Sequence, residues 1–320
     1  MIEFFKKRDF GSLIGDTFNF FKVYGKNYFK NYFLINGLLL ILMVVIMVLG
    51  YRELFQTFFG SNLRGETSYL ENYVSDNALL IVGVSILIFL LFAIMMIINY
   101  LFPVFYLKRI TNGQKEVATD EILNDFKQNF KKIVQLSLGM IFIVGPLSIL
   151  VVGLSYAMVL IIIGIFLLLF VLPTLYNVVM FLMYDYFNST RGFFDSLSYS
   201  LRSQFSYAHG RDKSPYWKYW GSTIIISIIL YIISTVITMI PMLFVYSSLL
   251  TSPSDAGFEQ NPFTGGFGIM LSVVYGVSML VSLILSNIMY VGVGFLYYDS
   301  RTDLHQGVKL AEIDTIGVNE

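Results

Sequence analysis

Six stretches of this chain are apolar over a length that can cross a lipid bilayer as a helix. The hydrocarbon core of a bilayer takes about 20 consecutive apolar residues in helical form. The composition agrees, because 56% of the residues are hydrophobic and only 13% are charged, whereas about a quarter of a soluble domain is charged. The sequence therefore predicts an all-α integral membrane protein, with residues 1–320 as a single polytopic domain. The six expected transmembrane helices lie at about 32–50, 78–107, 133–152, 156–184, 219–248 and 265–298.

The six helices are expected to form three hairpins. The third and fourth are separated only by Gly153, Leu154 and Ser155, which predicts a tight antiparallel turn there. One long helix is the alternative at this point, but its apolar length would far exceed the thickness of a bilayer.

Basic residues gather on one side of the predicted membrane. Of 21 Lys and Arg residues, only Arg52 and Arg64 lie on the other side. Loops rich in Lys and Arg stay in the cytoplasm, so both termini are expected to be cytoplasmic. The richness in Phe, Tyr, Ile, Asn and Lys is typical of an AT-rich bacterial genome. We therefore expect a multi-pass protein of the bacterial inner (cytoplasmic) membrane.

An amphipathic cytoplasmic helix is expected before each hairpin, at about 10–31, 119–132 and 190–206. Thr119 is the expected N-cap of the second, because Asp120 and Glu121 follow it in the first turn. Such helices either cover the inner ends of the bundle or dock a partner or anionic lipid. The basic residues that could do the docking are Lys22, Lys26, Lys30, Arg191 and Arg202.

The ends of the even-numbered spans resemble one another. Phe181–Asp185 and Phe295–Asp299 follow one pattern, and Phe105–Lys108 follows it loosely. Each of these spans also carries one asparagine in its inner half. A buried amide in a membrane needs a hydrogen-bond partner, which favours contacts between helices, and a polar substrate site is the alternative. The three candidate interhelical polar residues are Asn99, Asn177 and Asn287.

Small residues recur at four-residue spacing in the sixth span, where they would let helix backbones approach closely. These candidate helix-packing residues are Gly268, Ser272, Gly276, Ser278, Ser282 and Ser286.

The chemistry that the sequence lacks is also informative. It has no cysteine, and its two histidines, His209 and His305, lie outside the spans. No ionisable residue lies deep in a predicted span, which argues against proton-coupled transport. No phosphate-binding loop, zinc-protease helix or nucleophile elbow is present, and no basic tract is dense enough for nucleic acid. We therefore expect no enzyme activity, cofactor, metal or nucleic-acid partner.

Two motifs resemble a known family. Arg8-Asp9-Phe10-Gly11-Ser12-Leu13-Ile14-Gly15-Asp16-Thr17-Phe18 is similar to the start of bacterial six-helix proteins related to the glycerophosphoryl diester phosphodiesterase membrane domain. Tyr297-Tyr298-Asp299-Ser300-Arg301, with Gly307 shortly after, is similar to that family's Tyr-Tyr-Asp-x-Arg ending. The resemblance implies a non-catalytic helical membrane module whose activity is largely unassigned, and it carries over no catalytic residue.

Two functions remain open. The first is a non-enzymatic accessory or scaffold subunit of a cell-envelope assembly, with membrane lipids and other membrane or cytoplasmic proteins as partners. The second is a transporter or lipid-handling protein with a neutral intramembrane cavity near the three asparagines and the proline kinks.

Overall fold

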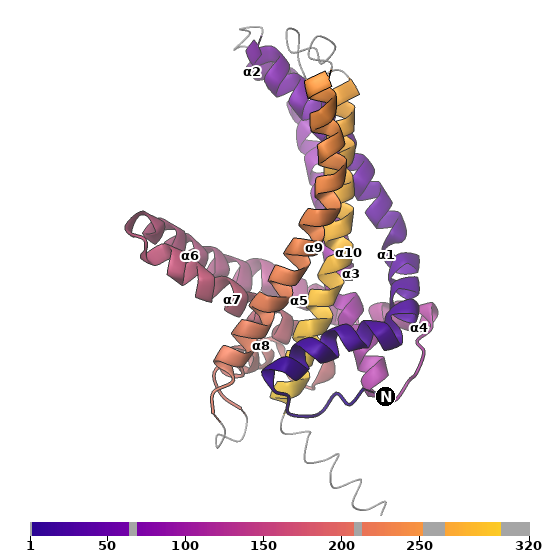
Figure 1. Ribbon diagram of the computed structural model, residues 1–320, viewed down its shortest axis with the longest axis vertical. Coiled ribbons are helices and arrows are strands. Elements are labelled where there is room, and N and C mark those ends of the chain that lie inside the picture. The colour runs from indigo at the N-terminus through magenta and orange to yellow at the C-terminus, as the bar shows by residue number, and fades with distance from the viewer. Residues whose placement is uncertain (1, 64–68, 208–212, 252–265, 302–320) are drawn as a thin grey trace, which may run out of the picture. The chain divides into compact units, whose positions relative to one another are not determined.

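The computed structural model describes residues 2–63, 69–207, 213–251 and 266–301, which form helices and connections and contain no strand. Within them, six helical segments are long and apolar enough to cross a membrane: Phe10–Gly50, Ala78–Thr111, Phe130–Ile161, Ile163–Asn188, Tyr216–Ile240 and Ile269–Ser300. The chain is thus a multi-pass, all-helical membrane protein. The elements are α1 (Phe10–Leu63), α2 (Tyr69–Asp76), α3 (Ala78–Thr111), α4 (Thr119–Gln128), α5 (Phe130–Gly139), the π-helix η1 (Met140–Val144), α6 (Gly145–Ala157), the 3₁₀-helix η2 (Met158–Ile161), α7 (Ile163–Asn188), α8 (Phe193–Arg202), α9 (Tyr216–Thr251) and α10 (Gly266–Ser300) (Figure 1).

The first predicted amphipathic helix and the first span are one continuous helix, α1. No proline interrupts residues 10–63, and lysine is a good helix former, so nothing in the basic segment ends the helix. The other two predicted amphipathic segments, 119–132 and 190–206, contain the shorter helices α4 and α8.

Thr119 is not the N-cap of α4. That position belongs to Ala118, whose backbone N–H donates to the Glu121 side chain at 2.9 Å. This hydrogen bond holds the pKa of Glu121 below its usual range. The Thr119 hydroxyl instead donates to the Asn31 side-chain oxygen of α1 at 2.5 Å. Thr119 therefore makes a tertiary contact with α1 and does not cap its own helix.

The turn between the third and fourth spans lies later than Gly153–Ser155. Helix α6 continues to Ala157, and the chain turns at Ile162, whose φ is 66°. A Cβ atom on Gly164 would lie 2.2 Å from the Val159 nitrogen, whereas no heavy atom lies within 4 Å of the same position on Gly153. The turn therefore needs its small residue at Gly164, and α6 and α7 run side by side (Figure 1).

Prolines act differently in the spans. Pro103 and Pro173 lie inside α3 and α7, while Pro146 lies in the first turn of α6, directly after the π-helix η1. Proline has no N–H to offer the preceding turn, and a local π-helical adjustment in a membrane helix can satisfy the backbone carbonyl that this leaves free.

The helices form two compact units. The first unit contains Met1–Ile35, Tyr100–Ile228 and Asn287–Glu320, and the second contains Asn36–Asn99 and Ile229–Ser286. In the second unit, Leu271 and Val274 of α10 pack with Met242 of α9 and Met270.

The first unit has an aromatic core. The start of α1 crosses three other helices: Phe10 lies against Gly221 of α9, and Thr17 lies against Gly292 of α10. Phe20 then contacts rings on α10 and α3. The largest side chains that are fully buried are Tyr28, Tyr32, Tyr106, Tyr184, Tyr219, Tyr297, Tyr298, Phe20, Phe102, Phe105, Phe181 and Phe295.

The turn at Gly164 can be tested against a matched control. We expect Gly164→Ala to destabilise the protein by about 1–3 kcal/mol, because the added methyl overpacks the α6–α7 turn. Gly153→Ala should leave stability unchanged or raise it, because its methyl enters open space in a helix. Thermal unfolding in detergent measures both, and equal midpoints for the two variants would contradict the assigned turn.

Candidate functional site

A row of three lysines runs along one face of α1 in the first unit. Lys22, Lys26 and Lys30 are exposed, and they make no ion pair with any described residue. The opposite face of the same helix is held by Tyr24 and Tyr28, which are 6% and 0% exposed. Because that face is packed, the three ammonium groups, which we call the lysine row, point away from the protein.

Several other basic side chains in this unit pair with carboxylates of the protein itself. Arg8 pairs with Asp16 at 2.8 Å, and burial lowers the pKa of its guanidinium while Asp16 opposes that shift. Arg109, Arg191 and Lys218 also pair with carboxylates at 2.6–2.8 Å. The described residues of the unit include 17 basic and 10 acidic ones, so the surplus positive charge lies on exposed groups such as the lysine row.

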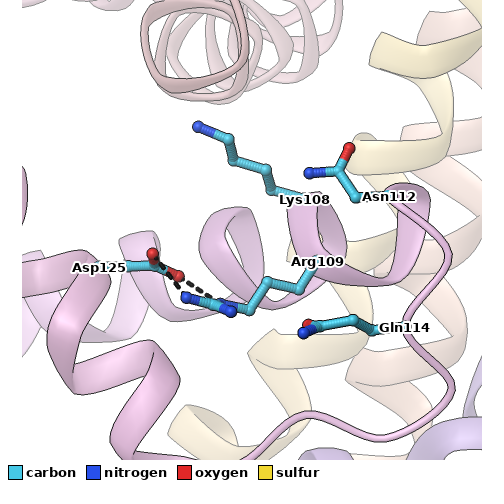
Figure 2. Close-up of a pocket in the computed structure, with 5 residues that line it drawn as sticks. All are labelled: Lys108, Arg109, Asn112, Gln114 and Asp125. Atoms are coloured by element: carbon cyan, nitrogen blue, oxygen red, sulfur yellow. Dashed lines mark hydrogen bonds and ion pairs between the residues drawn. The ribbon is translucent and has the colours of Figure 1, made fainter.

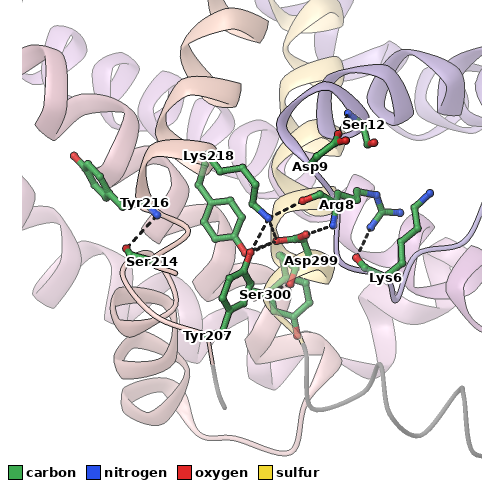
Figure 3. Close-up of polar contacts among 12 residues, drawn as sticks. Lys6, Arg8, Asp9, Ser12, Tyr207, Ser214, Tyr216, Lys218, Asp299 and Ser300 are labelled. Atoms are coloured by element: carbon green, nitrogen blue, oxygen red, sulfur yellow. Dashed lines mark hydrogen bonds and ion pairs between the residues drawn. The ribbon is translucent and has the colours of Figure 1, made fainter. Parts of the chain in front are cut away.

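Asp299, at the end of α10, joins three parts of the chain that are far apart in sequence (Figure 3). Its carboxylate is fully buried and accepts from the Arg8 backbone N–H at 2.5 Å, from Lys218 Nζ at 2.6 Å and from the Tyr219 hydroxyl at 2.7 Å. The Tyr207 hydroxyl donates at 3.2 Å to the carboxylate oxygen that Lys218 and Tyr219 also contact. Lys218 Nζ also donates to the Arg8 carbonyl at 2.9 Å. The buried charge is therefore both paired and hydrogen-bonded, as stability requires.

Asp185 occupies the matching position at the end of α7. It is fully buried, and its carboxylate contacts Arg191 at 2.8 Å and Arg301 at 3.8 Å. The Tyr297 hydroxyl donates to it at 3.3 Å. This carboxylate therefore joins the end of α7, the turn before α8 and the end of α10.

At the end of α3 the charges are reversed, because the long helix supplies the cation and the short helix supplies the carboxylate. Arg109 binds Asp125 of α4 through two hydrogen bonds, of 2.6 and 2.9 Å (Figure 2). A small cavity of about 290 Å³ lies beside this pair and is lined by Lys108, Arg109, Asn112, Gln114 and Asp125. Lys108 donates to the Phe187 carbonyl at 2.7 Å. The cations here are already bound to protein oxygens, so the arrangement suits holding the α3–α4 turn.

The two predicted docking arginines differ. Arg191 pairs with Asp185 and lies over the Tyr199 ring, 4.3 Å from its centroid. Arg202 is exposed, and its side chain makes a single hydrogen bond among the described residues, to the Ser198 carbonyl at 3.4 Å. Arg202 therefore keeps a charge available to a partner, whereas the charge of Arg191 serves the fold.

Helix α8 buries two of its three serines and exposes large apolar side chains. Ser196 and Ser200 are fully buried, and Tyr199 hydrogen-bonds Ser300 of α10 at 2.8 Å. Phe194 and Leu201 are 68% and 48% exposed. The exposed side of α8 thus combines these apolar side chains with the polar Asp195, Ser198 and Arg202.

The three asparagines lie in packed surroundings. Asn177 accepts from Thr223 of α9 at 2.7 Å, and Asn287 accepts from Tyr28 of α1 at 2.8 Å. Asn99, in the second unit, is fully buried.

The small residues of α10 that were predicted to pack helices together differ in their surroundings. A Cβ on Gly276 would lie 2.9 Å from Val48 of α1, and Ser272 is buried. Ser278 and Ser286 donate to carbonyls of their own helix, while Ser282 is exposed. Gly268 lies outside the residues whose side-chain surroundings the structure describes.

Sequence reasoning did not assign the carboxylates a role. In the sequence, Asp185 and Asp299 stand out only as parts of the similar span endings and, for Asp299, of the Tyr-Tyr-Asp-x-Arg motif. Their contacts with Arg301, Lys218 and the Arg8 backbone N–H come from segments far away in the sequence. The usable signal was the recurrence of an acidic residue where a span meets the basic side.

The Asp299 cluster generates a stability prediction. Asp299→Asn leaves Lys218 buried without its anion, which costs about 3–5 kcal/mol when one partner of a buried pair is removed. We expect a clearly lower unfolding midpoint in detergent for this variant.

Two further variants sharpen that measurement. Glu116→Gln, at an exposed carboxylate without a described ion pair, should leave the midpoint unchanged. The double variant Asp299→Asn/Lys218→Met should recover part of the loss, because no unpaired charge stays buried. A wild-type midpoint for Asp299→Asn alone would show that the cluster does not hold the N-terminal segment.

Comparisons with known proteins do not place the chain in a family. No protein-family model, no curated protein and no solved structure matches it.

Proposed function

We propose that this chain is a non-enzymatic accessory or scaffold subunit of a cell-envelope assembly, which docks a partner through its basic side. The observation that carries the proposal is the lysine row: three exposed charges that make no ion pair with any described residue, on a helix whose other face packs into an aromatic core. A preformed row of positive charge attracts and orients an acidic surface without any rearrangement of the protein.

The orientation is part of the proposal. Charge in the described residues is concentrated in the first unit, while the second unit contributes only Arg52, Glu53, Glu71 and Asp76. We assign the basic side, with both termini, to the cytoplasm of a bacterial inner membrane, following the bias of Lys and Arg towards that side.

We also propose that the six spans form three hairpins, each preceded by an amphipathic helix. Packing of α6 against α7 and the exposed apolar side chains Phe194 and Leu201 of α8 support it. The resemblance to the glycerophosphoryl diester phosphodiesterase membrane domain is consistent with this layout and with a role without catalysis.

A transporter or lipid-handling protein with a neutral cavity at the asparagines is the weaker candidate. Asn177 and Asn287 use their side-chain oxygens to bind neighbouring helices, so these groups support packing more than solute binding.

The lysine row can be tested by recovery of partners. In a mild-detergent pulldown from the native membrane, we expect Lys22→Gln/Lys26→Gln/Lys30→Gln to retain less than about a tenth of the wild-type partner. The control Lys115→Gln/Lys127→Gln/Lys213→Gln removes the same charge from exposed positions elsewhere and should retain it. Equal retention by both variants, or recovery of the wild type as a lone monomer, would refute the docking proposal.

The absence of cysteine allows a direct test of orientation. Val74 of α2 is 50% exposed, and Lys115 is exposed between α3 and α4. On intact cells, with the outer membrane permeabilised if one is present, a membrane-impermeant maleimide should label Val74→Cys and spare Lys115→Cys until the inner membrane is opened. The reverse pattern would invert the topology.

A further inference from the structure

A cavity of about 520 Å³ lies in the first unit, apart from the lysine row. It is bounded by α5 and η1, by the end of α7 and by the start of α8, and we call it the α5–α8 groove. Its lining residues are Gln135, Leu138, Gly139, Phe142, Ile143, Tyr186, Gly192, Phe193 and Phe194.

One glycine makes the groove possible. A Cβ atom on Gly139 would lie 2.3 Å from the ring of Phe193. That distance is far inside van der Waals contact, so only glycine lets the Phe193 ring lie directly on the backbone of α5. The ring then forms an apolar wall of the groove.

The groove changes from polar to apolar along its length. At its polar end, Lys132 lies over the Tyr186 ring, 5.7 Å from the centroid, and the Tyr186 hydroxyl donates to Gln135 Oε1 at 3.2 Å. Gln135 is exposed, and its amide nitrogen has no hydrogen-bond partner among the described residues. Further along the helices the lining consists of Leu138, Phe142 and Ile143.

The length of this gradient matches one leaflet of a bilayer. Ten residues separate Lys132 from Phe142, which is about 15 Å at the rise of a helix. Half of the hydrocarbon core is also about 15 Å thick. Phe142 and Phe194 are 72% and 68% exposed, so the groove opens onto surface that suits lipid chains rather than water.

We propose that the α5–α8 groove binds one membrane phospholipid with an anionic headgroup. Lys132 and the Gln135 amide donate to the phosphate region, beside the exposed Lys131. One acyl chain lies along Leu138, Phe142 and the Phe193 ring. The site is on a different element from the lysine row, so it does not depend on the docking of a protein partner.

The test uses the full chain, purified in detergent and incubated with phosphatidylglycerol or phosphatidylcholine, with the retained lipid measured by native mass spectrometry. We expect the wild type to retain one phosphatidylglycerol in preference to phosphatidylcholine. Lys132→Gln/Gln135→Ala should bind phosphatidylglycerol about tenfold more weakly and lose the preference. Phe142→Ala should weaken both lipids alike. All three side chains are exposed, so these variants are expected to fold.

Matched controls make the outcome decisive. Lys127→Gln/Gln128→Ala makes the same chemical change at exposed positions of α4 and should retain phosphatidylglycerol as the wild type does. Gly139→Leu should abolish retention by filling the groove, with Gly153→Leu as its control on the open side of α6. Equal retention of the two lipids by the wild type would overturn the proposal. So would unchanged binding in Lys132→Gln/Gln135→Ala, or an equal loss in the α4 control.

Discussion

The buried carboxylate of Asp299 is the contact on which the first unit depends. A charge inside a protein is tolerated only when it is paired and its oxygens are hydrogen-bonded. Asp299 meets this condition with groups from residues 8, 207, 218 and 219. It thereby attaches the segment before α1 to the start of α9 and to the end of α10. This attachment fixes the point at which α1 begins to cross those two helices.

The path of α1 determines which of its residues can act outward. With Thr17 against Gly292 and Phe20 against the rings of α3 and α10, one face of the helix is committed to packing. The lysine row is then left on the opposite face. Its charges make no ion pair with any described residue, whereas Arg8, Arg109, Arg191 and Lys218 already pair with carboxylates.

The similar span endings share a physical role. Asp185 pairs with Arg191, which follows its span, and Asp299 pairs with Lys218 at the start of α9. Arg109 does the same with reversed sign towards Asp125 of α4. Each ending therefore ties a membrane helix to a short helix or segment on the basic side. This use of charge also explains why a count of basic residues overstates the charge that a partner or lipid would meet.

The sequence by itself determined the class of the protein, because a span needs only enough consecutive apolar residues, and that property is local. It also identified the lysine row, since spacing of four along a helix places residues on one face whatever surrounds them. The tertiary structure alone decided the turn at Gly164, the loss of the Thr119 cap to Asn31, and the internal pairing of Arg191. It alone created the α5–α8 groove, which exists because Gly139 admits the ring of a residue 54 positions away. The Thr119–Asn31 contact and the groove join segments far apart in the sequence, and the turn and the Arg191–Asp185 pair depend on how the chain folds back after a helix. Helical periodicity carries no record of either kind of contact.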